Sequence, residues 1–324
     1  MEKSTPKTAA VLGANGQDGT WLIRNLKKRG YKVVGAGIEP EPRLAQDAGY
    51  SYQTVDLTDP RFSSSFLKSV KPELVFHVAA VHASAAGSSK LDYELKWQLM
   101  LAVNTASVHT ILEYFRTENQ QGRLLYLSSG KMFGPDYPEI VNENSPKKRK
   151  CLYTITKGAT EDLIFYYRER HGSHSSIIYP FPHESDLRPS DFFIAKLAST
   201  LADALAGRAG KTTFFGLDFY GDWGLAEEYM DICIDVAERA IGQDFLLAAG
   251  KSWYARDLAR AVFEKCGLRY EDYIETGVSS SSDYFLVSTQ KLADAIGRVP
   301  QQSVLDLIIA MARSAQTQSE TGAV

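Results

Sequence analysis

A tyrosine and a lysine lie four residues apart in the segment Tyr153-Thr-Ile-Thr-Lys157. In a helix this spacing places both side chains on one face. An ammonium group beside a phenol favours the phenolate and therefore lowers the pKa of the tyrosine. Tyr153 could then take a proton from a sugar hydroxyl while hydride leaves the same carbon, or return a proton to a ketone. The spacing is common by chance, so this interpretation depends on the segments around it.

Hydroxyl groups stand at the end of an earlier apolar run, in the segment Tyr126-Leu-Ser128-Ser129. A serine hydroxyl at a strand end could orient the substrate oxygen beside Tyr153. We favour Ser129 in this role, and Ser128 is the alternative.

A glycine-rich turn near the N-terminus has the pattern of a dinucleotide-binding site. It reads Gly13-Ala-Asn-Gly16-Gln-Asp-Gly19 and lies between an apolar run and an amphipathic stretch. Glycines in such a turn allow a tight bend, close approach of a pyrophosphate and close packing of helix on strand. The helix that follows presents its N-terminus to the negative charge. The expected cofactor contacts from this turn are Gly13, Asn15, Gly16, Gln17, Asp18 and Gly19.

The residues after the second apolar run bear on the choice between NAD and NADP. Glu39 stands roughly 20 positions beyond the turn, where a carboxylate binds the adenosine ribose of NAD and repels the 2′-phosphate of NADP. Arg43 is close enough in the sequence to bind that phosphate. The sequence therefore favours NAD and leaves NADP open, and a solvated loop is the alternative for Glu39. Further cofactor contacts are expected from Asp56, Leu57, Ala79 and Ala80, and from Tyr153 and Lys157 near the ribose hydroxyls.

Apolar runs alternate with amphipathic stretches through the first half of the chain. This alternation predicts an α/β fold with a doubly wound, parallel Rossmann sheet covered by helices on both faces. After about residue 183 the pattern changes to mixed helices and short strands. The expected strands are 9–12, 32–35, 52–55, 74–80, 123–128, 177–180, 212–215 and 245–248, and the expected helices are 20–29, 61–69, 94–117, 192–206, 255–265 and 303–312.

This change of pattern divides the chain. We expect an NAD(P)-binding domain over residues 1–182 and a smaller C-terminal substrate lobe over residues 183–315, whose segments can interlace with the first domain. The lobe would cover the carboxyl ends of the strands, where open α/β sheets bind their ligands. Residues 316–324 read as a frayed tail.

The whole-chain composition narrows the class of protein. The 324 residues carry 36 Lys and Arg against 39 Asp and Glu, a net charge of -3, which argues against nucleic acid or an anionic membrane as a partner. No window offers about 20 consecutive apolar residues for a membrane span, and the N-terminus does not read as a signal peptide. The three cysteines are too scattered for a disulfide framework or a metal cluster. They fit a reducing compartment, so we expect a cytoplasmic protein without a metal site.

These motifs together resemble the extended short-chain dehydrogenase/reductase superfamily, in its branch of nucleotide-sugar epimerases, dehydratases and 4-ketoreductases. Within that branch the chain is most similar to the GDP-mannose 4,6-dehydratase family. The resemblance implies a nicotinamide cofactor, a nucleotide-sugar substrate, and a homodimer formed through a four-helix bundle of the helices around 94–117 and 153–170. The stretches that carry it are Gly16-Gln-Asp-Gly19, His183-Glu-Ser, Asp222-Trp-Gly-Leu-Ala-Glu-Glu-Tyr229 and Lys291-Leu-Ala-Asp-Ala-Ile-Gly297.

The sequence departs from the family pattern where the chemistry is decided. The family has a Thr followed two residues later by a Glu that removes the C5 proton of the sugar, and this chain has Ser129 and Lys131 there. The resemblance therefore makes Lys131 a further candidate catalytic residue, since a lysine that burial keeps neutral can take a proton and an ammonium group cannot. A lysine at this point also resembles some CDP-sugar epimerases and dehydratases. Pro182 and Gly221 replace an Asn and an Arg that hold the nucleotide in the family, so the base stays open. The remaining candidate substrate contacts are His82, His183, Arg188 and Lys196.

Three reactions remain open for such a site. After oxidation at C4 of a nucleotide-linked hexose, elimination across C5–C6 gives a 4,6-dehydratase, and return of hydride to the other face gives a 4-epimerase. Starting from a ketone gives a reductase. A non-catalytic dinucleotide-binding paralogue is the further alternative, against which the intact Tyr153, Lys157 and Ser129 argue. The basic run at 147–150 could steer a diphosphate, but a solvated loop is the simpler interpretation.

Overall fold

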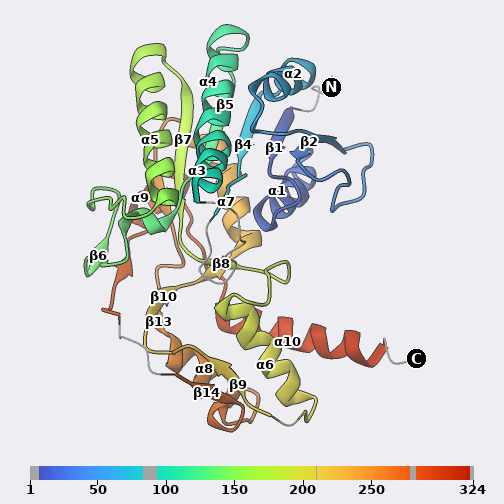
Figure 1. The fold of residues 1–324 in the computed structure, drawn as a ribbon, viewed down its shortest axis with the longest axis vertical. Helices are drawn as coiled ribbons and strands as arrows, with labels where there is room; N and C mark the ends of the chain where they lie inside the picture. Colours follow the sequence, from blue (N-terminus) through green and yellow to red (C-terminus); the bar gives the residue numbers. More distant parts are fainter. Residues whose placement is uncertain (1–6, 83–92, 209, 278–281, 322–324) are drawn as a thin grey trace.

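The computed structural model describes residues 7–82, 93–208, 210–277 and 282–321. Its centre is a seven-stranded sheet in which every strand pairs in parallel with its neighbours, in the order β12-β7-β5-β4-β1-β2-β3 (Figure 1). The expected Rossmann sheet is therefore confirmed. The strands are β1 (Thr8–Leu12), β2 (Lys32–Gly37), β3 (Tyr50–Thr54), β4 (Leu74–His77), β5 (Arg123–Leu127), β7 (His174–Pro180) and β12 (Phe245–Leu247).

The central strands are mainly apolar because helices cover both faces of the sheet. In β4 and β5 nearly every side chain is buried, as expected for parallel strands in a doubly wound fold. One face packs against α2 (Pro60–Val70), α4 (Ser107–Thr117) and α5 (Leu152–His171). The other face packs against α1 (Gln17–Lys28), α7 (Ala226–Arg239) and α9 (Gln290–Ile296).

The helix expected at 94–117 is interrupted. It consists of α3 (Tyr93–Leu101) and α4, joined by the five-residue π-helix Ala102–Ala106. Single π turns inside α-helices occur frequently at functional sites. Here the π turn holds Asn104, whose side chain is fully buried.

The second half of the chain contributes both to the main sheet domain and to a smaller lobe. The smaller lobe has its own apolar core from α6 (Phe193–Leu205), α8 (Ala255–Glu264) and α10 (Val304–Thr321) (Figure 1). Between these helices the chain returns to the main sheet through α7, β12 and α9. The strand expected at 245–248 therefore lies in the main sheet and not in the smaller lobe. Parallel pairing of β12 with β7 is a long-range contact that no local pattern reveals.

Short strand pairs connect and complete the lobes. They are β6 (Ile140–Val141) with β15 (Leu286–Val287), β8 (His183–Glu184) with β11 (Gly224–Leu225), β9 (Thr212–Phe214) with β14 (Ile274–Thr276), and β10 (Tyr220–Asp222) with β13 (Ser252–Tyr254). Helix α10 continues to Thr321, so much of the expected tail at 316–324 is helical. The reason is that no glycine or proline follows residue 300 until Gly322. Within the described part of the chain, no helix combines the length and the apolar character that a membrane crossing needs.

Candidate active site

Tyr153 and Lys157 lie in the first turns of α5, at the carboxyl end of the sheet. Cys151 caps this helix together with the side chain of Thr154. The Nζ atom of Lys157 donates a hydrogen bond of 2.7 Å to the carbonyl oxygen of Leu127, the last residue of β5. It lies 5.6 Å from the centre of the Tyr153 ring. The expected pairing of the two side chains on one helix face is therefore what the structure shows.

Ser129 and not Ser128 reaches the tyrosine. The side chain of Ser129 forms a hydrogen bond with the Tyr153 phenol. It also accepts a hydrogen bond of 3.2 Å from the backbone N–H of Lys131 and so caps the short 3₁₀-helix Gly130–Phe133. The hydroxyl of Ser128 is buried and has no hydrogen-bond partner among the described residues. The geometry thus brings Ser129, Tyr153 and Lys157 together.

Burial dominates the protonation of this group. Loss of solvent raises the pKa of Tyr153 to about 12, although its hydrogen bond to Ser129 acts in the opposite direction. Loss of solvent lowers the pKa of Lys157 to about 7, with the charge of Asp18 opposing the shift. We expected Lys157 to lower the pKa of the tyrosine. The structure shows the reverse shift because a phenolate this deeply buried is poorly solvated.

His82 and Lys131 add a second contact beside the tyrosine. The Nε2 atom of His82 lies 3.0 Å from the Nζ atom of Lys131, and the imidazole meets the Tyr153 ring edge-on with centroids 4.8 Å apart. Burial first, and then the charges of Lys131, Arg188 and Lys157, lower the pKa of His82 to about 4. A neutral imidazole at working pH can accept a hydrogen bond from the lysine ammonium group.

Asn104 is a residue that the sequence analysis missed. Its side chain accepts a hydrogen bond of 2.9 Å from the backbone N–H of Val81 and donates one of 3.1 Å to the Val81 carbonyl. It also donates to the hydroxyl of Thr156 on α5. The π turn thus fixes the segment that carries His82 against the helix that carries Tyr153. The only signal in the sequence is an asparagine amid the apolar residues of a predicted helix.

The glycine turn forms a cradle that side chains would fill. Gly13 has φ +93°, and a Cβ atom there would lie 2.7 Å from the backbone nitrogen of Ala79. A Cβ atom on Gly19 would lie 2.1 Å from the carbonyl oxygen of Gly13. Gly16 begins α1 with no side-chain cap, so the N–H groups of the first turn are left for an incoming anion. This donor set fits a dinucleotide pyrophosphate.

Asp18 and His183 join this turn to the first strand of the second half. The His183 Nε2 atom lies 2.8 Å from an Asp18 carboxylate oxygen, and its Nδ1 atom lies 2.8 Å from the Phe181 carbonyl. Burial alone would lower the pKa of His183, but the charge of Asp18 and its hydrogen bond raise it overall. The same pairing lowers the pKa of Asp18 against the effect of burial. Gln17 completes the link by donating to the His183 carbonyl at 3.1 Å.

Glu39 and Arg43 both lie against the glycine turn. The Asn15 amide nitrogen lies 3.3 Å from a Glu39 carboxylate oxygen. Arg43 donates from its backbone N–H to the Asn15 side chain and from Nε to the Asn15 carbonyl, each at 2.8 Å. The Tyr52 hydroxyl donates to the Glu39 carbonyl at 2.7 Å. Glu39 is therefore held beside the turn, and the Nε atom of Arg43 makes a backbone contact there.

The structure also shows where the other predicted cofactor and substrate contacts lie. Asp56 accepts hydrogen bonds from the backbone and hydroxyl of Thr58, and Ala79 packs over Gly13. The charge of Arg188 contributes to the lowered pKa of His82, so Arg188 lies near the site. Lys196 belongs to α6 of the smaller lobe and donates to the Thr213 carbonyl there. The remaining two predicted positions are Leu57, which packs against the core of the sheet, and Ala80, which follows the end of β4.

The basic residues at 147–150 form ion pairs with carboxylates of the same chain. Lys147 pairs with the buried Glu161, which also accepts from the Tyr179 hydroxyl. Arg149 pairs with Asp162 at 3.1 Å, and Lys150 pairs with Asp136 at 2.8 Å. These contacts hold the loop on α5, so the run is neither free to steer a diphosphate nor a purely solvated loop.

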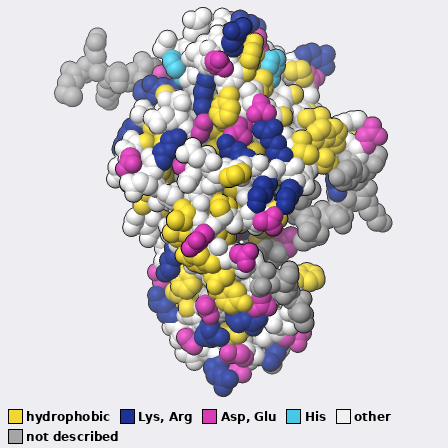
Figure 2. Space-filling model, turned by 90° about the vertical axis from the view of Figure 1, so that its left-hand side faces the viewer, with side chains coloured by type: hydrophobic (Ala, Val, Ile, Leu, Met, Phe, Trp, Pro, Cys, Tyr) yellow, Lys and Arg dark blue, Asp and Glu magenta, His cyan; other side chains and the backbone are white. Residues whose placement is uncertain are grey.

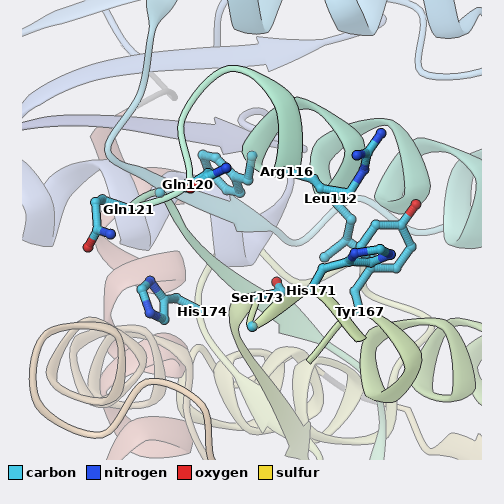
Figure 3. Close-up of a pocket in the computed structure, with 11 residues that line it drawn as sticks. Leu112, Arg116, Gln120, Gln121, Tyr167, His171, Ser173 and His174 are labelled. Atoms are coloured by element: carbon cyan, nitrogen blue, oxygen red, sulfur yellow. The ribbon is translucent and has the colours of Figure 1, made fainter. Parts of the chain in front are cut away.

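A cavity of about 390 Å³ lies elsewhere, where α4 and α5 end and β5 and β7 begin (Figure 3). Figure 3 shows Tyr167 and His171 of α5 close together on one wall, with Gln120 and Gln121 on the connection to β5. Because it opens at the amino ends of the strands, it is on the opposite edge from Tyr153. Open α/β sheets bind ligands at the carboxyl ends. Within the described ranges, no group of three or more His, Cys, Asp or Glu side chains is arranged to hold a metal.

A doubly wound sheet with a phosphate cradle at its first turn, a serine at the end of β5 and a Tyr–Lys pair on the following helix defines a class. This is the extended short-chain dehydrogenase/reductase fold of nucleotide-sugar epimerases and dehydratases. A narrower assignment comes from the sequence as a whole. The family model for GDP-mannose 4,6 dehydratase matches residues 10–295, and the chain belongs to this family.

Individual relatives are distant. A GDP-mannose 4,6-dehydratase from Sordaria araneosa is 26% identical over 280 residues, which are 84% of this chain and 50% of that protein, so the chain spans about half of its length. Among solved structures, dTDP-glucose 4,6-dehydratase from Bacillus anthracis with NAD has a TM-score of 0.79 at 12% identity, covering 97% of this chain and 98% of its own. RMD from Pseudomonas aeruginosa with NADPH has a TM-score of 0.77 at 17% identity, covering 97% and 100%. At these identities the structures support the fold alone.

Proposed function

We propose that this protein is an NAD(P)-dependent enzyme that oxidises or reduces C4 of a nucleotide-linked hexose. The observation that carries the proposal is the Ser129–Tyr153–Lys157 group at the carboxyl end of the sheet, beside the glycine cradle. The nicotinamide cofactor would supply the acceptor or donor of hydride. The glycine turn and the first turn of α1 would hold its pyrophosphate.

Each residue of the group has a separate task. Ser129 positions the substrate oxygen, and Tyr153 takes the proton from this oxygen during oxidation or returns it during reduction. Because burial raises the pKa of Tyr153 to about 12, the phenol is protonated at neutral pH and ready for reduction of a ketone. For oxidation, positive charge must lower the pKa of the phenol, and the Nζ atom of Lys157 lies 5.6 Å from the centre of its ring.

NAD is the cofactor that the contacts favour. Glu39 is held beside the glycine turn, where its carboxylate would meet the adenosine ribose and repel a 2′-phosphate. Cofactor preference is tested by comparing the Kd for NADH and NADPH in a fluorescence titration. Tighter binding of NADPH would contradict this reading of Glu39.

The fate of the 4-keto sugar separates two functions. Family membership favours 4,6-dehydration, which needs a base at C5. In this chain Lys131 contacts the neutral His82 beside Tyr153, and this observation favours 4-epimerisation or reduction as the second candidate. Loss of 18 mass units from a nucleotide hexose would establish dehydration, whereas a new anomeric proton signal at unchanged mass would establish epimerisation.

The first experiment compares the turnover of the wild-type protein with that of a variant lacking the Tyr153 hydroxyl. The purified protein is incubated with GDP-, CDP-, UDP- and dTDP-hexoses and NAD(P), or with 4-keto sugars and NAD(P)H. The products are followed by mass spectrometry and proton NMR. Tyr153→Phe should reduce turnover roughly 100- to 10,000-fold, the usual contribution of a general acid or base. Tyr166→Phe is the matched control, because Tyr166 lies on the same helix and is 52% exposed. Full turnover by Tyr153→Phe would refute the role, and no binding of any sugar nucleotide would favour the non-catalytic paralogue.

The same helix offers a surface for pairing of subunits. Hydrophobic side chains on α3 and α5 are exposed, and α3 packs beside α5. Figure 2 looks onto the side of the molecule where α5 lies and shows hydrophobic side chains there among charged ones. We infer a homodimer through a four-helix bundle, which light scattering of the purified protein would test. The exposed residues are Leu95, Ile155, Phe165 and Tyr166.

A further inference from the structure

Lys131 is a cation that no described residue neutralises. Its Nζ atom contacts the Nε2 atom of His82 at 3.0 Å, and no carboxylate of the described residues lies within ion-pair distance. The nearby basic run differs in this respect, because Lys147 and Lys150 each contact a carboxylate. An ammonium group that makes one such contact has two further N–H donors for an incoming anion.

The other charges near the tyrosine are matched in pairs. Asp18 is paired with His183 at 2.8 Å, and Glu184 with Arg188 at 3.3 Å. Lys157 is buried with its Nζ atom 5.6 Å from the centre of the Tyr153 ring, and burial lowers its pKa to about 7. Among these groups, the solvent-exposed lysine without a carboxylate partner is therefore Lys131.

Two sets of contacts connect Lys131 to Tyr153. Its backbone N–H contacts the Ser129 hydroxyl, and that hydroxyl contacts the Tyr153 phenol. The side chain of His82 also connects the two residues, because its ring contacts both the Lys131 ammonium group and the Tyr153 ring. An anion bound by Lys131 would be adjacent to the oxygen that Tyr153 serves. A hydrogen-bonded ion pair of this kind is among the stronger polar contacts.

We propose that the substrate is a nucleotide-linked hexuronate whose carboxylate binds Lys131. This inference rests on the proposed function, since it places the C4 hydroxyl at Tyr153. The carboxylate carbon of a hexuronate is attached to C5, the neighbour of C4, and it offers no C6 hydroxyl for elimination. The reaction would then be 4-epimerisation. Tyr153 would take the proton from the C4 oxygen and return it to the same oxygen. Bound NAD would supply the hydride acceptor and then the hydride donor for the opposite face of C4, so that no net oxidant is consumed.

The test compares matched substrates on the holoenzyme. Turnover of UDP-glucuronate is measured against UDP-glucose, and of GDP-mannuronate against GDP-mannose, and the ratio of kcat/KM within each pair is the readout. The wild-type protein should favour the uronate in at least one pair by roughly 10- to 100-fold, the usual range for a hydrogen bond to a charged group. Lys131→Met and Lys131→Gln should abolish this preference, and Lys131→Arg should retain it. Lys150→Met, which removes the same charge from a paired surface site, should leave the ratio unchanged.

Several outcomes would overturn the inference. These are a wild-type preference for the uncharged hexose in both pairs, or an equal loss for both members of a pair in Lys131→Met. An equal loss would mean that Lys131 binds the diphosphate that both share. If no nucleotide sugar turns over, the proposed function fails separately, and calorimetric binding of the same pairs to the NAD-bound Tyr153→Phe protein still decides the inference. Equal affinity for uronate and hexose there would refute it.

Discussion

Lys157→Met should make the protein more stable while it removes the activity. Lys157 is 1% exposed, and burial lowers its pKa from 10.5 to about 7. A lysine whose pKa is lower in the folded state destabilises the fold wherever its unfolded form is protonated. This penalty is fully present below the folded pKa and disappears as the pH rises through the unfolded value.

The size of the effect follows from these two pKa values. A difference of about 3.5 units between them corresponds to roughly 4 kcal/mol at pH 7 and roughly 2 kcal/mol at pH 9, at about 1.4 kcal/mol per unit. The variant also loses the hydrogen bond from Nζ to the Leu127 carbonyl, which costs about 1 kcal/mol. Methionine has a similar length and fits an apolar site. The net stabilisation should therefore be about 3 kcal/mol at pH 7 and about 1 kcal/mol at pH 9.

Urea unfolding followed by circular dichroism measures this difference. The wild-type protein and Lys157→Met are compared at pH 7 and pH 9 without added cofactor, and hydride transfer is assayed on the same samples. Lys150→Met is the control, because its surface ion pair with Asp136 should change the free energy of unfolding by less than about 1 kcal/mol. A lower stability of Lys157→Met at pH 7, or the same gain at both pH values, would refute the reasoning.

Two further predictions concern the cradle and the buried ion pair. Gly13→Ala should weaken NADH binding at least tenfold in a fluorescence titration, because its Cβ atom would lie 2.7 Å from the Ala79 nitrogen at a φ of +93°; unchanged affinity would rule out this turn as the cofactor site. Glu161→Gln should destabilise the fold by about 3–5 kcal/mol in urea unfolding, because it leaves the Lys147 charge without its buried partner. A loss below 1 kcal/mol would mean that Lys147 simply turns to solvent.

Short-range sequence patterns were enough to predict the glycine turn, the Tyr–Lys pair and most strands of the sheet. A glycine turn between a strand and a helix has few other uses, and its context predicted the phosphate cradle at Gly13, Gly16 and Gly19. The spacing of Tyr153 and Lys157 fixed their common helix face because 3.6 residues complete a turn. The apolar runs that became the central strands β1, β4 and β5 are buried on both faces, which gives the continuous pattern that the sequence displays.

The tertiary structure decided what depends on contacts between distant segments. Residues 245–247 joined the main sheet because pairing with β7 buries them, and their own pattern would suit either lobe. Asn104 became a clamp because a π turn points it at Val81. Lys131 and His82 stand 49 positions apart in the chain and meet beside Tyr153.

The protonation of the site was also beyond the sequence. Residue types predicted that Lys157 would lower the pKa of Tyr153, but the degree of burial, which only the folded chain determines, outweighs that charge. The carboxylates that neutralise the run at 147–150 likewise come from residues up to 14 positions away that the fold brings back to it. Spacing along the chain determines which groups share an element, and packing determines which of them keep a charge.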